Sequence, residues 1–528
     1  MNRNDLIAPE IYNVTSEMES LSIEGEQTAI RWLNEHSKRR SLSYSQLTEE
    51  MNRYANVLTR AGLNKGERVL IILPRLPEAY IVYLACLKAG LVAVPCSEML
   101  RAKDLDYRMH HSEAKAIIAY HSAINEINQM EDGSIEYYFI VGQDRHNWAR
   151  LETLAQAEET TFETVSTHRE DIAFLSYTSG TTGNPKGVVH SHGWGYAHLR
   201  TAAKGWLDVR SKDVVWATAA PGWQKWIWSP FLSTIMLGAT AFVYHGPFNA
   251  HTYLKLLQDE QINVLCCTPT EYRLMAKVDQ LSSYKLEHLR STVSAGEPLN
   301  RPVIEAFKTA FNLDVRDGYG QTENTLLVGT QLDMTVKPGS MGKPTPGNDV
   351  EIIDENGEVV NVNEVGDIAV HKDAPALFQH YYKEPEKTKA TYRGDWYLTG
   401  DLASKDEDGY FWFEGRSDDI IISSGYTIGP FEVEDALTKH DAVQECAVVG
   451  APDEVRGNIV KAYVVLKKRN NKVNEEELIH ILQEHTKKWT APYKYPRKIE
   501  FVHELPKTNS GKIRRVELRQ REREQSNV

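Results

Sequence analysis

Cysteine is scarce in this chain, and the few cysteines form no recognisable framework. The chain of 528 residues has only Cys86, Cys96, Cys266, Cys267 and Cys446. None of them belongs to a CxxC pair or to a spacing typical of zinc ligands. The sequence therefore predicts neither a disulfide framework nor a structural metal site, and it favours a reduced, cytoplasmic protein.

Long hydrophobic runs and an excess of basic charge are also missing. The first twenty residues lack the apolar core of a signal peptide, and the best apolar window, residues 231–244, is too short to span a bilayer and reads as core. The formal net charge of −13 argues against a general nucleic-acid binder, because neutralising phosphates requires a basic surface. We expect no integral membrane association and no nucleic-acid partner, while a local cluster of cations for an anionic ligand stays open.

What the sequence does contain is an ordinary globular composition, with 41% hydrophobic and 25% charged residues. Its length exceeds what one compact core accommodates, so two or more domains are expected. Residues 67–95 predict a strand, a helix and a second strand, which is one βαβ unit of a parallel sheet. Residues 171–180 predict a strand that enters a glycine turn, and residues 262–278 predict a strand and a helix. This alternation predicts an α/β fold for the larger part of the chain.

The pattern changes after residue 405. Asp408 and Gly409 predict a hairpin turn, with residues 410–413 as its outgoing strand. Beyond Arg416 we expect short strands at 445–450 and 461–466 and two helices, one opening at Pro430 and one capped by Asn474, with Glu477 three residues on. This predicts an N-terminal domain over residues 1–416 and a small α+β domain over residues 417–528. The charged tail, residues 514–528, is expected to be frayed or solvated.

The stretch "TSGTTGNPKG", residues 178–187, directly follows the predicted strand at 172–177. It fails the Walker pattern, since Lys186 is preceded by Pro185 and followed by Gly187, and no G-x-G-x-x-G is present. Glycines nevertheless allow several N–H groups to point at one anion, and hydroxyls add further donors. We favour a phosphate-binding loop over the alternative, a Ser/Thr/Gly surface turn.

With its companions, this stretch resembles the signature loop of the adenylate-forming enzymes, which include acyl-CoA synthetases, luciferases and peptide-synthetase adenylation domains. The companions occur in order along nearly the whole chain: "SAGEPLN" (294–300), "DGYGQTEN" (317–324), "YLTGD" (397–401), "GRSDD" (415–419) and "LPKTNSGKIRR" (505–515). The stretches "SSGYTIGPFEVEDAL" and "APYKYPRKIEFV" are most similar to bacterial medium-chain acyl-CoA synthetases.

The resemblance implies the adenylate-forming fold, with a large N-terminal domain of mixed sheets and helices and a small, mobile C-terminal lid. It also implies an ATP-dependent acid–thiol ligase. A carboxylate would attack the α-phosphorus of ATP to give acyl-AMP and pyrophosphate, and the thiol of coenzyme A would then displace AMP. The implied ligands are ATP with Mg²⁺, a carboxylic acid and coenzyme A, as in fatty acid metabolism. The oligomeric state stays open.

The resemblance assigns most of the nucleotide site to three motifs and two later residues. The loop would hold the β and γ phosphates, Thr322 would contact the α-phosphate, and Glu323 would bind Mg²⁺, a cation that prefers carboxylate and phosphate oxygens. Asp401 and Arg416 would take the ribose hydroxyls. The remaining implied ATP-binding residues are Thr178, Ser179, Gly180, Thr181, Thr182, Gly183, Asn184, Pro185 and Lys186 in the loop, Gly296, Glu297, Pro298 and Asp317 around adenine, and Gly318, Tyr319, Gly320 and Gln321 beside them.

Two further sets come from the predicted small domain. Lys512 is the implied catalytic residue, whose ammonium would neutralise charge as the carboxylate oxygen meets the α-phosphate. Asp418 is the implied hinge for a rotation of this domain between the two half-reactions. The implied CoA-binding residues are Ser424, Gly425, Tyr426, Arg456, Lys487 and Arg497, although the last three could equally be ordinary exposed cations.

The resemblance implies that the acyl pocket is lined by Trp223, Ala295 and Gly320. Acetyl-specific relatives carry tryptophan and valine at the positions that match Gly320 and Ala295, so two small residues here leave room for further methylenes, each worth ~0.8 kcal/mol when buried. We expect a medium-chain, branched or small aromatic acid. Lys225 beside Trp223 is expected to point outward; an inward direction would allow a polar acyl group. Thr427 stands where medium-chain relatives commonly carry arginine, so no role is transferred to it.

Other functions compete with the acyl-CoA synthetase. An adenylating enzyme that loads a carrier protein shares the first half-reaction, and a carrier in trans stays open although this chain shows no carrier segment. A non-catalytic nucleotide-binding protein would predict loss of Lys512, Glu323 or the loop, and all three are intact. Nothing in the sequence favours an oxidative luciferase reaction.

Overall fold

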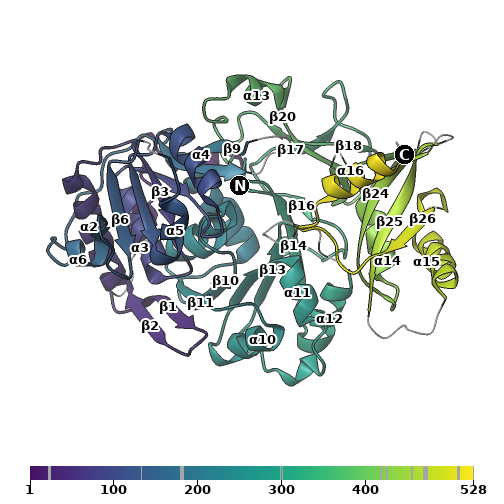
Figure 1. Cartoon of the computed structure of the whole chain (residues 1–528), viewed down its shortest axis with the longest axis horizontal. Helices are drawn as coiled ribbons and strands as arrows, with labels where there is room; N and C mark the ends of the chain where they lie inside the picture. The colour runs from purple at the N-terminus through teal and green to yellow at the C-terminus, as the bar shows by residue number, and fades with distance from the viewer. Residues whose placement is uncertain are drawn as a thin grey trace.

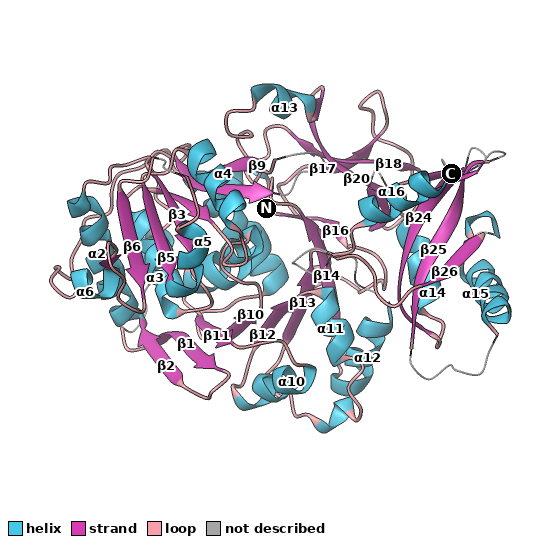
Figure 2. Ribbon diagram, in the orientation of Figure 1, coloured by secondary structure: helices cyan, strands magenta, loops and turns pink. Residues whose placement is uncertain are grey.

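A computed structural model of the chain contains mixed sheets and helices in a large N-terminal part, with a smaller C-terminal part beside it (Figures 1 and 2). The structure describes residues 1–21, 25–131, 134–178, 184–297, 299, 301–416, 419–423, 426–453, 456–467, 474–490, 492–507 and 512–526. The strands of these residues form five sheets. A search of the same residues finds no helix with the length and apolarity to cross a membrane. The predicted α/β class is confirmed.

A seven-stranded sheet occupies the left of Figure 1, in the order β7-β6-β5-β3-β4-β8-β9. Its pairs are parallel except for β8 with β9. The predicted βαβ unit is confirmed, because helix α3 (Pro77–Lys88) connects β3 to its parallel neighbour β4. The strand bounds are β3 Arg68–Ile72, β4 Val92–Pro95, β5 Ala116–Tyr120, β6 Tyr137–Val141, β7 Ala149–Arg150, β8 Ile172–Thr178 and β9 Lys186–Ser191.

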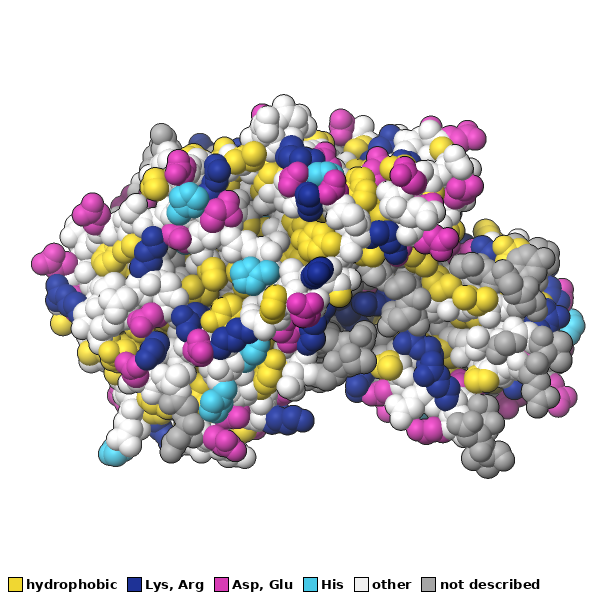
Figure 3. Space-filling view, turned by 90° about the horizontal axis from the view of Figure 1, so that it is seen from above, with side chains coloured by type: hydrophobic (Ala, Val, Ile, Leu, Met, Phe, Trp, Pro, Cys, Tyr) yellow, Lys and Arg dark blue, Asp and Glu magenta, His cyan; other side chains and the backbone are white. Residues whose placement is uncertain are grey.

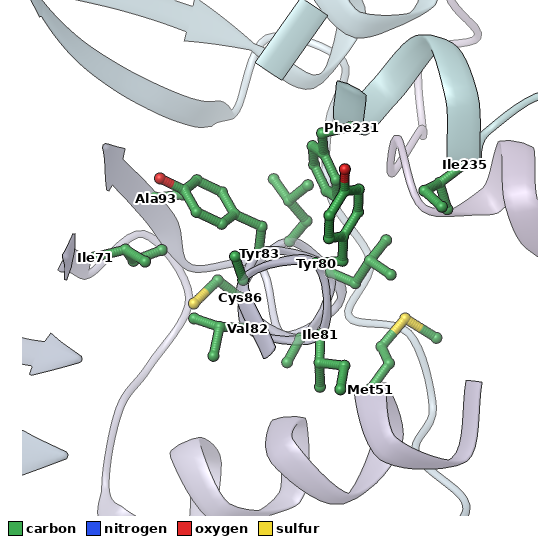
Figure 4. Packing of buried hydrophobic residues seen from close by; sticks show 14 of the residues in the cluster. Met51, Ile71, Tyr80, Ile81, Val82, Tyr83, Cys86, Ala93, Phe231 and Ile235 are labelled. Carbon is green, nitrogen blue, oxygen red and sulfur yellow. The ribbon is translucent and has the colours of Figure 1, made fainter. Parts of the chain in front are cut away.

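Helix α3 is buried along its whole length. Figure 4 looks along the helix: Tyr80 points towards Phe231, and Ile81 lies on the side of Met51 from α2 (Tyr44–Ala61). The ring centroids of Tyr80 and Phe231 are 6.2 Å apart. Because neighbours cover every side, the helix needs no polar stripe, and its two charged residues, Glu78 and Lys88, are paired with Arg40 and Glu19. The apolar window at 231–244 contributes to this core, as expected.

A nine-stranded sheet follows, in the order β16-β15-β14-β13-β12-β10-β11-β1-β2. The strand and helix predicted over 262–278 are confirmed as β12 and α11 (Pro269–Met275), with Thr268 as a capping residue. All five cysteines lie in described positions and are buried free thiols. The strand bounds are β1 Thr28–Asn34, β2 Arg39–Ser43, β10 Val214–Ala217, β11 Thr240–His245, β12 Val264–Cys267, β13 Ser291–Ala295, β14 Val315–Gly320, β15 Leu326–Gly329 and β16 Lys343–Pro344.

A five-stranded sheet contains the predicted hairpin. Strand β20 (Trp396–Lys405) and strand β21 (Phe411–Arg416) are antiparallel, and Gly409 between them has a positive φ of 82°, which glycine adopts without strain. The outgoing strand begins at Phe411 and continues to Arg416, so it lies slightly later than the predicted 410–413. The other members are β17 Val350–Ile353, β18 Val365–His371 and β19 Tyr392–Arg393.

Several helices connect or cover these sheets, and two of them contain π-helical segments. The π segments are η3 (Leu199–Leu207), which continues α7, and η4 (Ile227–Leu232), which continues α8. The α-helices are α1 Ser16–Glu19, α4 Ala102–Ser112, α5 Ile124–Ile127, α6 Leu151–Ala155, α7 His192–His198, α8 Gln224–Trp226, α9 Ser233–Ile235, α10 Ala250–Asp259, α12 Arg301–Phe311 and α13 Pro385–Ala390.

The C-terminal part has its own packing. Two hydrophobic clusters consist only of residues between 421 and 518. The two predicted helices are confirmed as α14, which opens at Pro430, and α15, whose cap Asn474 accepts from the N–H of Glu476 rather than forming a capping box with Glu477. The elements are β22 Ile421–Ser423, β23 Tyr426–Ile428, β24 Val443–Asp453, β25 Gly457–Leu466 and β26 Lys498–Phe501, with α14 Pro430–Thr438, α15 Glu475–Trp489 and α16 Arg515–Ser526.

The expectation of a frayed or solvated tail is only partly right, because most of its described residues are exposed but they form a packed helix. Residues 515–526 form helix α16, which packs on the C-terminal sheet through Leu518 and Glu522, 4% and 5% exposed. Glu522 is buried because Lys461 of β25 lies 2.7 Å from its carboxylate and Tyr463 donates a hydrogen bond to it. The predicted strands are also longer than expected, and the parallel pair of β25 with β26 was not predicted.

Candidate active site

The ends of β13 and β14 meet the β20–β21 hairpin, and motif residues from all four strands lie there. Ala295 at the end of β13 is paired with Gly318 of β14. The Tyr319 hydroxyl donates to Asp401 Oδ2 at 2.5 Å, and Gln321 Nε2 donates to the same oxygen at 2.7 Å. Asp401 is buried and stands opposite Arg416 in the hairpin register. Motifs far apart in sequence therefore share one site.

Lys512 reaches this site from the C-terminal part of the chain. Burial lowers its pKa; Glu297 and Asp401 oppose that shift, while Arg416 and Lys225 reinforce it. Lys512 is nevertheless an exposed residue, so its side chain keeps contact with solvent at this position. Figure 3 shows the surface hollowed between the two parts of the molecule, with Lys and Arg side chains along the hollow.

Asp401 is the carboxylate to which these contacts converge. Burial raises its pKa, and hydrogen bonds from Tyr319 and Gln321 and the charges of Arg416 and Lys512 oppose the rise. A buried carboxylate that keeps several donors around it remains a good acceptor for hydroxyl groups.

The described base of the phosphate loop is tied to Glu323. Thr178 and Lys186 pair across β8 and β9 at the two ends of the loop. The Lys186 ammonium donates to the Tyr381 hydroxyl at 2.9 Å and lies 3.9 Å from Glu323 Oε1, to which Tyr381 itself donates at 2.8 Å. Asn184 and Pro185 are described, whereas residues 179–183 lie outside the described residues. Tyr381 was missed by the sequence analysis because it belongs to no motif.

Glu323 and Thr322 continue this region. His190 of β9 holds the Thr322 carbonyl oxygen through its Nε2 at 2.6 Å, so the backbone of this motif is attached to the strand after the loop. The described residues contain no group of three His, Cys, Asp or Glu side chains that could hold a metal. A cation at Glu323 would therefore depend on that one carboxylate and on oxygens of a ligand.

Residues of the expected adenine slot are fixed by internal hydrogen bonds. Gly296 has a φ of 108°, which favours glycine, and Glu297 is bonded to Arg273 of α11 at 2.9 Å. Asp317 accepts from the backbone N–H groups of Gly318 and Leu299, at 2.8 and 3.3 Å, and burial raises its pKa to about 7. The turn that begins at Gly296 is thus held against β14. Pro298 lies outside the described residues.

The expected acyl residues are close-packed around the end of β14. Ala295 is buried, and a Cβ at Gly320 would lie 2.1 Å from the Thr325 carbonyl oxygen and 3.0 Å from the Trp228 ring. The neighbouring backbone therefore requires glycine at position 320. Trp223, 39% exposed, precedes α8 as its N-cap.

The expectation that Lys225 points outward is wrong. Its ammonium nitrogen is buried and lies 5.1 Å from the ring centroid of Trp206 and 5.6 Å from that of Trp228. The helical turn at 224–228 directs this side chain inward between two indoles that come from different helices. The sequence could not reveal this, because Lys225 is next to one tryptophan in sequence and packs against two others.

The expected CoA residues are only partly described. Lys487 lies 4.3 Å from the Tyr495 ring centroid and pairs with Glu484, and Arg497 donates to the Tyr495 hydroxyl at 3.0 Å. Lys487 and Arg497 are thus brought together, and Arg456 lies in the turn between β24 and β25. Tyr426 is the first residue of β23, while Asp418, Ser424 and Gly425 lie outside the described residues.

Comparison with known proteins links this arrangement to one family. The profile of the AMP-binding enzymes matches residues 20–382, and that of the AMP-binding enzyme C-terminal domain matches residues 432–512. A relative from Bacillus subtilis (strain 168), the uncharacterized acyl–CoA ligase YtcI, is 59% identical over 522 residues, covering 99% of this chain and 98% of the relative. The mitochondrial acyl-coenzyme A synthetase ACSM3 of Rattus norvegicus is 42% identical and covers 97% of this chain and 91% of its own length.

Two solved structures share the fold over essentially the whole chain. The anthranilate CoA ligase AuaEII, in complex with anthranoyl-AMP, has a TM-score of 0.91 and 30% identity, and the match covers 100% of both chains. A benzoate CoA ligase from Burkholderia xenovorans LB400 has a TM-score of 0.85 and 30% identity, with 96% of this chain and 100% of the other covered.

Proposed function

This chain belongs to the family of AMP-binding enzymes and is an acyl-CoA ligase, and on that premise we propose how its residues carry out the two half-reactions. In the first, a carboxylate oxygen attacks the α-phosphorus of ATP, the bond to the bridging oxygen breaks, and pyrophosphate leaves with the electron pair. In the second, the sulfur of coenzyme A attacks the acyl carbon, AMP leaves, and the thiol proton is released. Both steps depend mainly on positioning and charge neutralisation.

The observation that carries this proposal is the meeting of motif residues at Asp401, which accepts from Tyr319 and Gln321 at 2.5 and 2.7 Å and interacts with the charge of Lys512. Asp401 and Arg416 take the ribose hydroxyls, as a paired acceptor and donor. Lys512 stands where the carboxylate oxygen meets the α-phosphate, so its ammonium offsets the charge that develops there. The pKa of Lys512 is lowered because its ammonium loses water at this position before ATP is bound. The negative charge of the ATP phosphates would then favour the charged form again.

Residues 178–186 hold the β and γ phosphates, with Lys186 as the cation at the end of the loop. Glu323 is the residue that would bind Mg²⁺, and its setting fits, because Tyr381 donates to one oxygen and leaves the other for a cation shared with phosphate oxygens. Bound there, the ion would supply Lewis-acid stabilisation of the phosphate charge.

The C-terminal domain, residues 417–528, alternates between two orientations about Asp418. The hydrophobic clusters that use only residues beyond 421 support a domain able to move as a unit. One orientation brings Lys512 to the nucleotide. The other presents Ser424, Gly425 and Tyr426 to the acyl-adenylate, with Arg456, Lys487 and Arg497 binding phosphates of coenzyme A.

The acid is larger than acetate. Ala295 and Gly320 keep the end of the pocket free of large side chains, and two similar structures are ligases of small aromatic acids by name. A pyrophosphate-release screen over acids of graded length, branching and aromaticity, with and without coenzyme A, tests the proposal. Acetate as the best acid would refute the size argument, and pyrophosphate release without any thioester would favour loading of a carrier protein instead.

A further inference from the structure

Three hydrogen-bond donors next to the acyl residues have no partner. They are Lys225 Nζ, Gln224 Nε2 and Trp228 Nε1, all buried and all without a hydrogen bond to any described residue. The Gln224 amide is oriented by its oxygen, which accepts from Ser176 Oγ at 2.5 Å. Its NH₂ group is therefore the part that has no hydrogen-bond partner. All three belong to one helical turn, residues 224–228, and all three are N–H donors.

This turn faces the strand that ends in the candidate acyl pocket. A Cβ at Gly318 would lie 2.6 Å from the Trp206 ring, and one at Gly320 would lie 3.0 Å from the Trp228 ring. The Lys225 ammonium lies over both of these rings. It therefore stands beside β14 near Gly318 and Gly320, where β13 contributes Ala295.

Both indoles come from π-helical segments, Trp206 from η3 and Trp228 from η4. Such segments are rare and occur frequently at functional sites, because the extra residue per turn redirects side chains at some cost in hydrogen-bond geometry. Here two of them converge on one lysine. Two π-helical segments that both place an indole against Lys225 indicate a binding site rather than ordinary core packing.

The charge balance at this position calls for an anionic acceptor. Aromatic faces attract an ammonium but accept none of its N–H groups in the way an oxygen does, so the N–H groups of Lys225 remain without an acceptor. Asp317, whose charge interacts with Lys225, has its own oxygens committed to the N–H groups of Gly318 and Leu299. A ligand oxygen is the group that the arrangement lacks.

We propose that the acid substrate carries a second carboxylate on its acyl group, bound by Lys225 with Trp228 Nε1 as a further donor. The inference rests on the proposed acyl-CoA ligase function and names the substrate class of that same site. A carboxylate fits better than a hydroxyl, because it is an acceptor only and neutralises the ammonium. One carboxylate reacts with ATP, and the other remains in the pocket through both half-reactions.

The test compares matched pairs of acids, such as hexanoate with adipate and pentanoate with glutarate, in the coupled pyrophosphate-release assay with ATP and coenzyme A. For the best pair we expect the wild type to prefer the diacid at least tenfold in kcat/KM. Lys225→Met should reverse the preference, mainly through KM of the diacid, while Lys225→Arg should keep it. Lys204→Met, an exposed lysine on the η3 segment that carries Trp206, is the matched control and should behave as wild type.

A second measurement does not depend on the variants. Diacids should raise the thermal midpoint of the wild type in the presence of ATP more than alkanoates of equal length. Wild type that prefers alkanoates in every pair, or a diacid preference that Lys225→Met leaves intact, overturns the proposal. If no acid releases pyrophosphate, the proposed function itself has failed; if alkanoates react and diacids do not, only the inference about Lys225 has failed.

Discussion

Replacing Arg515 by methionine should loosen the last helix of the chain and the lysine that precedes it. Arg515 opens α16, three residues after Lys512, and its guanidinium makes a two-pronged ion pair with Glu434 of α14, at 2.8 and 2.6 Å from Nη2. The Glu434 carboxylate is buried and otherwise accepts only from the N–H of Val448, at 2.8 Å, among the described residues. Without Arg515, the buried Glu434 carboxylate would keep only the Val448 N–H as a donor among the described residues, and its charge would be unpaired.

The magnitude follows from burial. Removing one partner of a buried ion pair costs about 3–5 kcal/mol, whereas an exposed pair is worth below about 1 kcal/mol. Arg514 supplies the matched control, because this neighbouring arginine pairs with Glu517 at the surface, where the two side chains are 48% and 41% exposed. At 1.4 kcal/mol per tenfold change, a loss of about 3 kcal/mol in local stability corresponds to roughly 100-fold faster opening of α16.

Hydrogen exchange of the α16 amides in the full-length enzyme measures this opening. We expect Arg515→Met to raise exchange by the factor above, and Arg514→Met to change it less than about tenfold. ATP–pyrophosphate exchange should fall in Arg515→Met, while transfer of the acyl group from added acyl-AMP to coenzyme A should persist. Equal exchange of α16 in the two variants would refute the reasoning, since the buried pair would then contribute no more than the exposed one.

Three further predictions concern the site itself. Lys512→Met should lower ATP–pyrophosphate exchange by roughly 10²–10³-fold yet leave acyl transfer from acyl-AMP to coenzyme A within a few-fold of wild type; equal losses in both assays would contradict an adenylation role. Gly320→Ala should lower the free energy of unfolding by about 1–3 kcal/mol, because its Cβ would meet the Thr325 carbonyl oxygen at 2.1 Å, and Gly450→Ala, whose Cβ finds nothing closer than 3.5 Å, should cost clearly less in the same thermal melts. Burial raises the pKa of Asp317 from 3.8 to about 7, so the folded state holds a proton that the unfolded state has lost, and this group lowers stability as pH rises through that interval. Asp317→Asn should therefore raise Tm more at pH 8 than at pH 5, and an equal shift at both pH values would contradict the assignment.

Local patterns in the sequence were sufficient for much of the fold. The strand, helix and strand over 67–95 were predictable because an apolar run, an opening proline and a terminal glycine act within a few residues of each other. The turn at Gly409 and the helix start at Pro430 follow from backbone preferences of single residues. The family motifs indicated which strand ends meet, and Tyr319, Asp401 and Gln321 do meet.

The failures share one physical cause, which is that the stabilising partner lies far away in sequence. Helix α16 has few apolar residues, so its sequence reads as solvated, yet Glu522 is buried by Lys461 and Tyr463 of β25. Lys225 reads as an exposed lysine and is directed inward between Trp206 and Trp228. Such contacts cannot be predicted from a single sequence. Periodicity indicates which face of a helix or strand is apolar, but it does not indicate which distant residue a charged side chain will contact.

In the proposed mechanism, the charges around the site give a reason for adenylation to use Lys512, a residue from the far end of the chain. Desolvation and the cations Arg416 and Lys225 disfavour the Lys512 ammonium at the site, whereas Glu297 and Asp401 favour it. Asp401 is also shared with Tyr319 and Gln321, so it cannot neutralise Lys512 alone. If the C-terminal domain moves as proposed, Lys512 would approach when the phosphates of ATP supply negative charge and would withdraw once pyrophosphate has left, which would free the same position for the thiol.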